Sequence, residues 1–310
     1  MRRPMTSCIL LLASCGAHIS SNPEDEHGSL DAGVGVDAST PGHDAAPAAD
    51  AAPLGPWSAP AAVTVAATGA IEDDVTLTSN ALEMVYAIAD PTTGKKDLYY
   101  TSRTAIGAPW APVTKLPFDR DTSSEETPRF SPDDKTLYFA SDRAADDGNL
   151  DIYAVTHAAT TDALWGLPRP VAPFATPATE KWLSPCSDGH YVVVQSTAAG
   201  DTDLFEGTLG SAAPPAPIDV LNTTMTETGA FLTADCLTVY FASFRVTPEK
   251  IFVSHRASVG SPWQPPAPVD DFKIAGGNGA QEDPWLSPDG RTFAFASDAA
   301  GTKDVYLSTR

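Results

Sequence analysis

Acidic side chains recur at intervals of about 53 residues along most of the chain, each just before a short run of alternating apolar residues. The recurring acids are Asp73 with Asp74, Glu126, Glu180, Glu227, and Glu282 with Asp283. Carboxylates that converge on one point can bind a hard cation such as calcium, or a basic segment of a partner. The candidate binding residues are therefore Asp74, Glu126, Glu180, Glu227 and Glu282. In the alternative interpretation, each acid caps a turn or pairs with a backbone amide within its own repeat.

Two further sets of polar residues recur with the same period. The first set precedes a predicted strand and is expected to form hairpin hydrogen bonds: Asp97, Asp151, Asp203 and Asp304. The second set follows the aromatic residue of that strand by four positions and is interpreted as solvated strand ends: Arg103, His157, Arg256 and Arg310. His190 lies in an Asp-Gly-His turn and is expected to be exposed. No metal site is predicted from histidines, because those of the repeat region lie in different repeats.

Four cysteines occur, and their positions suggest different fates. Cys8 lies in an apolar stretch near the N-terminus and Cys15 at its end, whereas Cys186 and Cys236 follow corresponding strands of neighbouring repeats. In an oxidising compartment the latter two are candidates for a disulfide. They remain two separate buried thiols if the turns lie beyond the Cα separation of about 7 Å that a disulfide tolerates.

Composition excludes several classes of protein. The 310 residues include 40 acidic and 19 basic side chains, for a net charge of −21, which disfavours binding to nucleic-acid phosphates. No apolar run approaches the roughly 20 residues of a membrane-spanning helix. The sequence also lacks the Gly-x-Ser-x-Gly, His-Glu-x-x-His and glycine-rich phosphate-loop motifs, and no cofactor is predicted.

The N-terminal part reads as an export signal followed by a tether. Arg2 and Arg3 precede a short apolar run that ends in Leu12-Ala13-Ser14-Cys15, which resembles the lipobox of bacterial lipoproteins. This resemblance implies a signal peptide over 1–15, lipidation of Cys15, and a lipid anchor in the outer membrane that faces the periplasm or the cell surface. Residues 16–55 are rich in Ala, Asp and Pro and are predicted to be a disordered acidic tether.

From residue 56 to 310 the chain consists of five similar units. Each unit contains a Pro-rich string, usually with Trp, as in Pro109-Trp110-Ala111-Pro112. Each also contains a turn followed by apolar alternation, clearest in Phe130-Ser131-Pro132-Asp133-Asp134 and Leu286-Ser287-Pro288-Asp289-Gly290, and most contain Gly-x-x-Asp-apolar-aromatic. Pro-Asp-Gly favours a turn, period-two alternation favours strands, and Pro belongs on a sheet edge.

These pieces predict an all-β, five-bladed β-propeller of four-stranded antiparallel blades. The chain begins with an edge string at Trp57 and ends after a third-type strand, so we expect the N-terminal strand to join the last blade and close the ring. The strings Glu-x-x-Pro-x-Phe-Ser-Pro-Asp-Asp and Pro-Trp-Leu-Ser-Pro-Asp-Gly-Arg resemble the WD-like repeat of TolB-type propellers. That resemblance implies the fold and only weakly a function.

Two functions fit such a propeller. The favoured hypothesis is a non-catalytic binding scaffold that recognises a protein, peptide or envelope glycan at the mouth of its central channel. The alternative is a carbohydrate-active enzyme similar to the five-bladed glycoside hydrolases, which use carboxylates in the central funnel. The regular recurrence of the acids favours the first, because catalysis needs unlike carboxylates whose pKa values differ.

Overall fold

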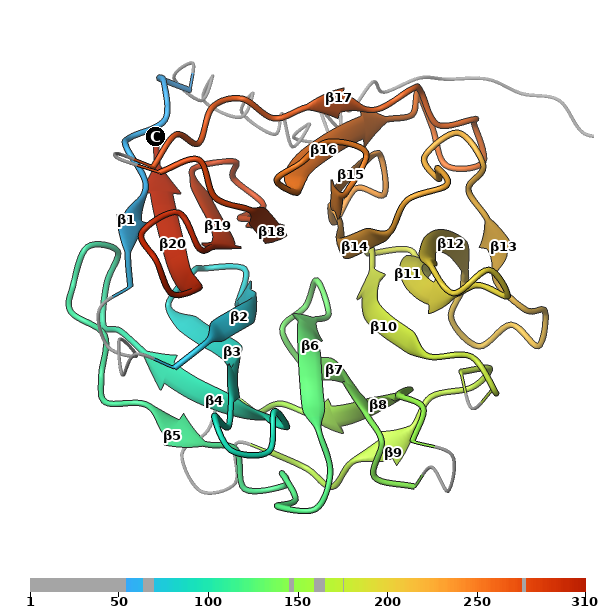
Figure 1. Ribbon diagram of the computed structural model, residues 1–310, viewed down its shortest axis with the longest axis horizontal. Coiled ribbons are helices and arrows are strands. Elements are labelled where there is room, and N and C mark those ends of the chain that lie inside the picture. The colour runs from blue at the N-terminus through green and yellow to red at the C-terminus, as the bar shows by residue number, and fades with distance from the viewer. Residues whose placement is uncertain (1–53, 64–69, 145–147, 159–164, 175, 275–276) are drawn as a thin grey trace, which may run out of the picture. The chain divides into compact units, whose positions relative to one another are not determined.

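The computed structural model describes residues 54–63, 70–144, 148–158, 165–174, 176–274 and 277–310. These residues form twenty strands in five four-stranded antiparallel sheets, which surround a central axis (Figure 1). The predicted five-bladed propeller is thereby confirmed. The predicted signal peptide, Cys15 and residues 16–53 of the predicted tether lie outside the described residues. No helix in the described part is long and apolar enough to cross a membrane.

Each blade runs from an inner strand at the axis to a short outer strand (Figure 1). The inner strands are β2 (Glu72–Leu77), β6 (Glu125–Phe130), β10 (Glu180–Pro185), β14 (Glu227–Leu232) and β18 (Gln281–Leu286). The second strands are β3 (Glu83–Ala89), β7 (Thr136–Ser141), β11 (His190–Ser196), β15 (Thr238–Ser243) and β19 (Thr292–Ser297). The third strands are β4 (Lys96–Ser102), β8 (Asp151–Thr156), β12 (Thr202–Thr208), β16 (Lys250–His255) and β20 (Asp304–Thr309). The outer strands are β5 (Thr114–Lys115), β9 (Arg169–Pro170), β13 (Ala216–Pro217), β17 (Ala267–Pro268) and β1 (Ala61–Ala62).

The hydrophobic core lies between neighbouring blades. Five clusters of buried side chains each join two adjacent sheets; one of them packs Val192 and Leu204 of blade three against Val239 and Phe241 of blade four. The alternation predicted from the sequence explains this arrangement, because a strand buried on both faces presents apolar side chains to both neighbouring blades. The axis itself carries polar groups.

All five inner strands contain a bulge at their third residue. The backbone there has positive φ in every blade, at Asp74, Thr127, Trp182, Gly229 and Asp283. The pairing with the second strand shifts register directly after this residue. A bulge bends the strand and redirects the side chains on either side of it. The bulges therefore decide which side chains of each inner strand face the channel.

The residues that were interpreted as solvated strand ends instead clamp neighbouring strands together. This finding corrects that interpretation. Arg103, Arg256 and Arg310 lie 4.1–4.4 Å above the rings of Trp110, Trp263 and Trp57. Each arginine also donates to a backbone carbonyl of the turn after its inner strand, at Ala81, Cys236 and Gly290. Stacking on Trp shields these cations, of which Arg256 is buried and Arg103 and Arg310 are half-buried, and the sequence position alone did not reveal this.

His157 takes the same place in the second blade and joins it to the first. Its ring lies 4.8 Å from that of Trp165, and its Nε2 lies 2.9 Å from Glu83 Oε2 on β3. Burial lowers the pKa of His157, but the contact with Glu83 outweighs it and the pKa is raised above the usual value. The same hydrogen bond lowers the pKa of Glu83.

This pair predicts a pH-dependent contribution to stability. The His157 contribution is complete below its unfolded pKa of about 6.5 and is lost as the pH rises through its raised folded pKa. The Glu83 contribution is lost as the pH falls below about 4.5. We expect His157→Gln to lower the free energy of unfolding most between pH 5 and 6, by about 1 kcal/mol for each unit of raised pKa, and less at pH 9. Urea unfolding at both pH values tests this; an equal effect at both would contradict it.

The turns after β10 and β14 carry the two cysteines of the repeat region. The structure joins Cys186 and Cys236 in a disulfide with their Cα atoms 5.2 Å apart, within the range that a disulfide tolerates. The bond cross-links blades three and four across a sequence separation of 50 residues. It lies at the opposite end of the inner strands from the recurring acids.

Loss of this bond is expected to destabilise the propeller. Opening a loop of this length restores chain entropy worth about 4 kcal/mol to the unfolded state. We therefore expect the double variant Cys186→Ala/Cys236→Ala to melt roughly 10 °C lower than the oxidised protein. Calorimetry measures the shift. Equal melting temperatures, or titration of both thiols in denatured, unreduced protein, would contradict this prediction.

Candidate active site

The predicted binding acids occupy three different positions on the inner strands. Glu180 and Glu227 are the first residues of β10 and β14, Glu126 and Glu282 the second residues of β6 and β18, and Asp74 the third residue of β2. Successive side chains of a strand point to opposite faces, so a shift of one position turns a carboxylate away from the axis. The five acids therefore do not form one ring.

Glu180 and Glu227 serve their own blades. Both are fully buried. Glu180 accepts hydrogen bonds from Thr176 and Gln195. Glu227 accepts them from Thr223, Ser243 and Arg245 of blade four and its flanking loops. These two residues follow the local capping interpretation and do not contribute to the channel mouth.

The second residues of the inner strands do converge, and lysines lie between them. Lys96 and Lys303 each bridge carboxylates, whereas Lys181 pairs with Glu126 alone: Lys303 Nζ lies 2.8 Å from Glu282, Lys96 Nζ 2.9 Å from Asp73, and Lys181 Nζ 2.9 Å from Glu126. We call this alternating chain of charges the mouth network: Glu282, Lys303, Asp73, Lys96, Glu126 and Lys181. The ammonium groups of Lys96 and Lys303 lie between carboxylates and neutralise part of their charge. The sequence analysis did not single out the three lysines; Lys96 and Lys303 share the position just before the recurring Asp of the third strand.

Deeper in the channel, the bulge residues bring two further carboxylates together. The Asp74 amide, at the bulge of β2, donates to Asp283 Oδ2 on β18 at 2.9 Å. Trp182 Nε1 reaches across from β10 to donate to Asp283 Oδ1 at 2.8 Å. Asp74 Oδ2 accepts from the same Lys96 that contacts Asp73, at 2.8 Å. Asp73, Asp74 and Asp283 therefore form one cluster, which we call the carboxylate cluster, below the mouth network.

Arg129 crosses the channel beneath this cluster. The side chain is 1% exposed and donates to the carbonyls of Val75 in blade one and Ala230 in blade four, from its own place in blade two. Its Nη2 has no hydrogen-bond partner among the described residues. A buried cation beside buried carboxylates stabilises their ionised forms. Arg129 thus closes the floor of the mouth and adds positive charge to it.

The environment separates the pKa values of the three carboxyl groups. Burial alone would raise the pKa of Asp74, but Lys96, helped by Lys181 and Arg129, lowers it to about 2. Burial and then the charge of Asp74 raise the pKa of Asp73 well above its usual value. Burial, Asp74 and Glu282 raise the pKa of Asp283 to about 7. The cluster therefore combines a carboxyl group whose pKa is lowered with two neighbouring carboxyl groups whose pKa values are raised.

The two oxygens of Asp73 have different surroundings. Its Oδ2 contacts Lys96 and Lys303, whereas its Oδ1 is buried and has no hydrogen-bond partner among the described residues. A buried carboxyl oxygen without a partner is rare in folded proteins. It is the one carboxyl oxygen of the cluster that no described residue satisfies.

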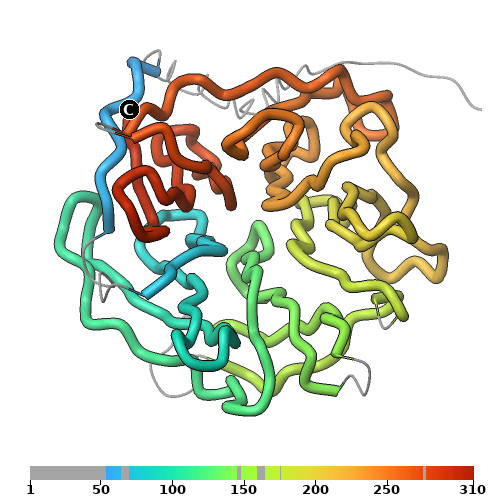
Figure 2. Tube along the Cα trace, viewed as in Figure 1, coloured from blue at the N-terminus to red at the C-terminus, as the bar shows by residue number. Residues whose placement is uncertain are grey.

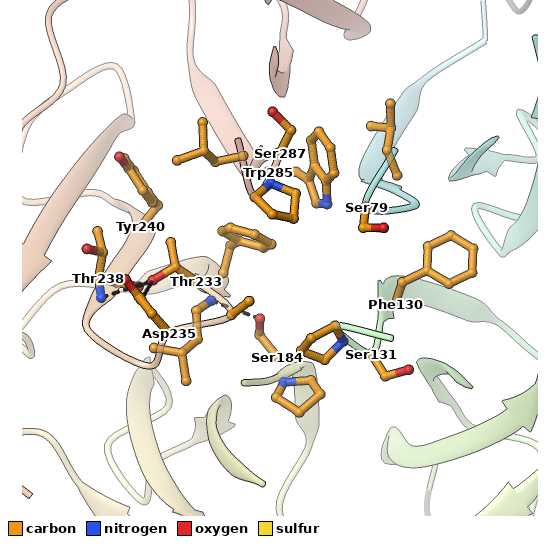
Figure 3. A pocket seen from close by; sticks show the side chains of 18 of the residues that line it. Ser79, Phe130, Ser131, Ser184, Thr233, Asp235, Thr238, Tyr240, Trp285 and Ser287 are labelled. Atoms are coloured by element: carbon orange, nitrogen blue, oxygen red, sulfur yellow. Dashed lines mark hydrogen bonds between the residues drawn. The ribbon is translucent and has the colours of Figure 1, made fainter. Parts of the chain in front are cut away.

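A pocket of about 350 Å³ opens at the other end of the inner strands (Figure 3). All five blades contribute, with Phe130, Tyr240 and Trp285 among the aromatic lining residues and Ser79, Ser184 and Ser287 among the hydroxyls. The pocket is lined from the fifth residue of the inner strands onward, whereas the carboxylate cluster occupies their second and third residues, so the two lie toward different ends of the channel, about 7–10 Å apart along a strand. Its two acids, Asp134 and Asp235, accept hydrogen bonds from Ser79 and Thr233 of the surrounding turns. The pocket is therefore shaped for binding and lacks an acid–base pair.

The remaining predicted polar residues are dispersed. Asp97 forms an ion pair with Lys115 at 2.9 Å within its own blade. Asp203 has a pKa raised by burial and then by Glu227, to about 6, and lies in the same blade as Glu180. His190, predicted as an exposed turn residue, is the first residue of β11; its side chain is 37% exposed and contacts Asp188. None of these side chains reaches the carboxylate cluster.

Comparison with known proteins gives a fold and no family. No protein-family model matches the chain, and no curated protein sequence is similar to it. Among solved structures, an α-L-arabinofuranosidase from Podospora anserina in complex with cellotriose aligns with a TM-score of 0.54 at 11% identity, over 83% of this chain and 96% of that one. A thermostable family-43 glycoside hydrolase aligns at 0.50 and 11% identity, over 76% and 88%. TolB from Acinetobacter baumannii aligns at 0.44 and 14%, over 79% of this chain and 56% of that one.

At these identities the likeness concerns the fold alone. It nevertheless corrects the favoured hypothesis of a non-catalytic scaffold, because the two better-aligned structures above are carbohydrate-active enzymes. The geometry removes the original reason for that hypothesis as well. The acids were taken as equivalent repeats, whereas the structure places them in different positions with different pKa values.

Proposed function

We propose that the protein is a glycoside hydrolase whose catalytic groups are Asp73 and Asp74 at the mouth of the propeller channel. The observation that carries the proposal is the opposite displacement of two neighbouring pKa values, with that of Asp74 lowered to about 2 and that of Asp73 raised. Glycoside hydrolysis requires such a pair, because one carboxyl must donate a proton while the other remains ionised.

The roles follow from the contacts of each residue. Asp73 donates its proton to the glycosidic oxygen as the bond between that oxygen and the anomeric carbon breaks. The Asp74 carboxylate, held by Lys96 at 2.8 Å, stabilises the positive charge that develops on the sugar ring. Water then adds to the anomeric carbon and gives its proton to Asp74. Proton exchange with solvent restores both groups.

Asp283 and Lys96 position this pair. Asp283 accepts a hydrogen bond from the backbone amide of Asp74 and so stabilises the bulge in which Asp74 lies. Lys96 contacts Asp73 and Asp74 at once, at 2.9 and 2.8 Å, which keeps the two carboxyl groups side by side. The lysines of the mouth network are about one quarter exposed and provide donors for sugar hydroxyls.

The N-terminal sequence supports a substrate near a membrane surface. A chain anchored through Cys15 and joined to the propeller by residues 16–55 would keep the channel within a few nanometres of the lipid. We therefore propose a polymeric or envelope-associated glycan as the substrate class. Replacement of Cys15 by Ser tests the anchor, because it should release the protein from the membrane fraction.

A hydrolysis screen tests the proposed activity. Purified protein is incubated with arabinan, arabinoxylan, xylan, cello-oligosaccharides and isolated bacterial envelope glycan, and new reducing ends are measured. The Asp73→Asn protein, prepared in parallel, serves as the blank for contaminating enzymes. We expect at least one substrate to be cleaved by the wild type and not by the variant. Equal release by the two proteins on every substrate would overturn the proposal.

A further inference from the structure

Asp188 and His190 lie beside the disulfide that joins blades three and four, and with its two sulfurs they are four potential metal ligands. Asp188 Oδ1 lies 3.2 Å from Cys186 Sγ and 3.1 Å from Cys236 Sγ. His190 Nδ1 lies 2.8 Å from the same oxygen. Cys186, Asp188 and His190 belong to one turn and its following strand, whereas Cys236 comes from the corresponding turn of the next blade. The two sulfurs and the Asp188 carboxylate thus lie within 4.8 Å of one another, and the His190 imidazole contacts that carboxylate from its other side.

We propose that this disulfide masks a site for zinc or a similar divalent transition metal, which forms when the bond is reduced. Two cysteine thiolates, one imidazole nitrogen and one carboxylate oxygen make up a donor set that tetrahedral zinc accepts. The proposed site is separate from the carboxylate cluster and does not depend on the glycosidase activity. In the oxidised state the sulfurs bond to each other and cannot act as thiolate ligands.

The two turns stay together without the disulfide. The Ser187 amide donates to the Ala234 carbonyl at 3.0 Å, which joins the same two turns through the backbone. The Cα atoms of the cysteines are 5.2 Å apart, and each sulfur lies at the end of a side chain that rotates about its Cα–Cβ bond. Reduction therefore leaves the thiols as neighbours, and a small rotation is enough to place both on one ion.

Access to the site is from one side. Both cysteines are buried, but the side chains of Asp188 and His190 are 45% and 37% exposed. A metal ion that arrives from solvent first meets the carboxylate and imidazole and then the sulfurs beneath them.

The reaction balances with a dithiol as reductant. The dithiol supplies two electrons and two protons and becomes a disulfide, while the Cys186–Cys236 bond becomes two thiols. Metal binding then releases the two thiol protons to solvent as the thiolates coordinate. Exchange with a small disulfide reverses both steps: it accepts two electrons from the two thiolates and two protons from solvent, becomes a dithiol, restores the Cys186–Cys236 bond and releases the metal.

Cobalt binding to the full chain tests the proposal. All samples carry Cys8→Ser and Cys15→Ser, so that Cys186 and Cys236 are the remaining thiols. We expect reduced protein to bind one Co²⁺ with thiolate-to-cobalt charge-transfer absorption and the strong visible bands of a tetrahedral site. The oxidised protein and the variant Cys186→Ser/Cys236→Ser should show neither.

Variants of the other two ligands separate this site from a simple dithiol. We expect His190→Ala and Asp188→Ala each to weaken Co²⁺ binding at least tenfold, and the control His255→Ala, in which another exposed histidine of the next blade is removed, to have no effect. Zinc should raise the melting temperature of the reduced chain and not that of the oxidised chain, because only binding to the folded state stabilises it. The proposal would be overturned if the reduced wild type bound Co²⁺ no more tightly than the double serine variant, or if His190→Ala bound Co²⁺ as tightly as the wild type.

Discussion

Replacement of Asp73 by Asn is expected to lower kcat/KM for glycan hydrolysis by about 10²–10⁴-fold while the propeller stays folded. The amide keeps the size of the side chain and removes the proton that the glycosidic oxygen receives. Because the pKa of Asp73 is raised, the wild-type carboxyl is protonated over a range where an ordinary aspartate is ionised. Initial rates on the cleaved substrate measure the loss, and the melting temperature reports on the fold.

A matched control distinguishes the loss of a catalytic group from the effect of replacing any buried acid. Glu180 is also a buried acid at the start of an inner strand, and its pKa is raised by burial to about 8, but it faces its own blade. Glu180→Gln should therefore leave kcat/KM unchanged within about twofold. Comparable losses in Asp73→Asn and Glu180→Gln would contradict the assignment of Asp73.

The pH profile provides a second readout of the same assignment. Activity requires Asp74 to be ionised and Asp73 to be protonated. Since Asp74 ionises at about pH 2, the acidic limb should lie below the range in which the protein is assayed. Activity should instead fall as the pH rises through the raised pKa of Asp73. The residual activity of Asp73→Asn should lack this alkaline limb.

Removal of residues 54–63 is expected to destabilise the whole propeller by about 4 kcal/mol or more. The strand β1 pairs with β20, where Ala61 lies opposite Leu307, and the Ser58 amide donates to the Thr309 carbonyl at 2.8 Å. Trp57 packs against Phe272 and Phe293 and lies beneath Arg310, 4.1 Å from its guanidinium carbon. We predict that this strand closes the ring, and that it does so through these contacts with the last blade.

The internal repeats supply a matched comparison for that prediction. Trp110 makes the same clamp with Arg103 in blade one, at 4.4 Å, but its strand follows β4 directly in the chain. We expect Trp57→Ala to accelerate proteolysis of the C-terminal blade and to lower the free energy of unfolding by about 3–5 kcal/mol. Trp110→Ala should also lower the free energy of unfolding, but it should not expose the chain ends to proteolysis. Equal unfolding midpoints for wild type and the truncated chain would contradict closure.

The fold could be predicted from the sequence because each level of the pattern repeats. Turns such as Ser131-Pro132-Asp133 and strings such as Pro109-Trp110 occur once per unit, so five weak local signals agree on one architecture. The clamps could have been predicted from the same repeats. In blade three the outer string lacks Trp, and Leu209 stands where the other blades have Arg or His. The joint absence of the Trp and the Arg or His from one unit indicates that these two residues contact each other in the other units.

The site could be predicted only in part, for a reason that lies in strand geometry. Asp74 and Asp283 belong to bulges, and Glu180 is one position away from the channel-facing Lys181. A shift of one residue reverses the direction of a side chain, and the sequence alone did not fix this register. The sequence also gave no signal that Lys96 would approach both Asp73 and Asp74, because the strands that carry them are brought together only by the complete blade.

The central claim is that one channel mouth holds carboxyl groups with widely separated pKa values. Carbon-13 NMR titration of the aspartate carboxyl groups, assigned with Asp73→Asn, Asp74→Asn and Asp283→Asn, measures this directly. We predict no titration of Asp74 above about pH 3, and midpoints near pH 7 for Asp283 and well above 4 for Asp73. Midpoints for all three groups within the ordinary range near pH 4 would contradict the account.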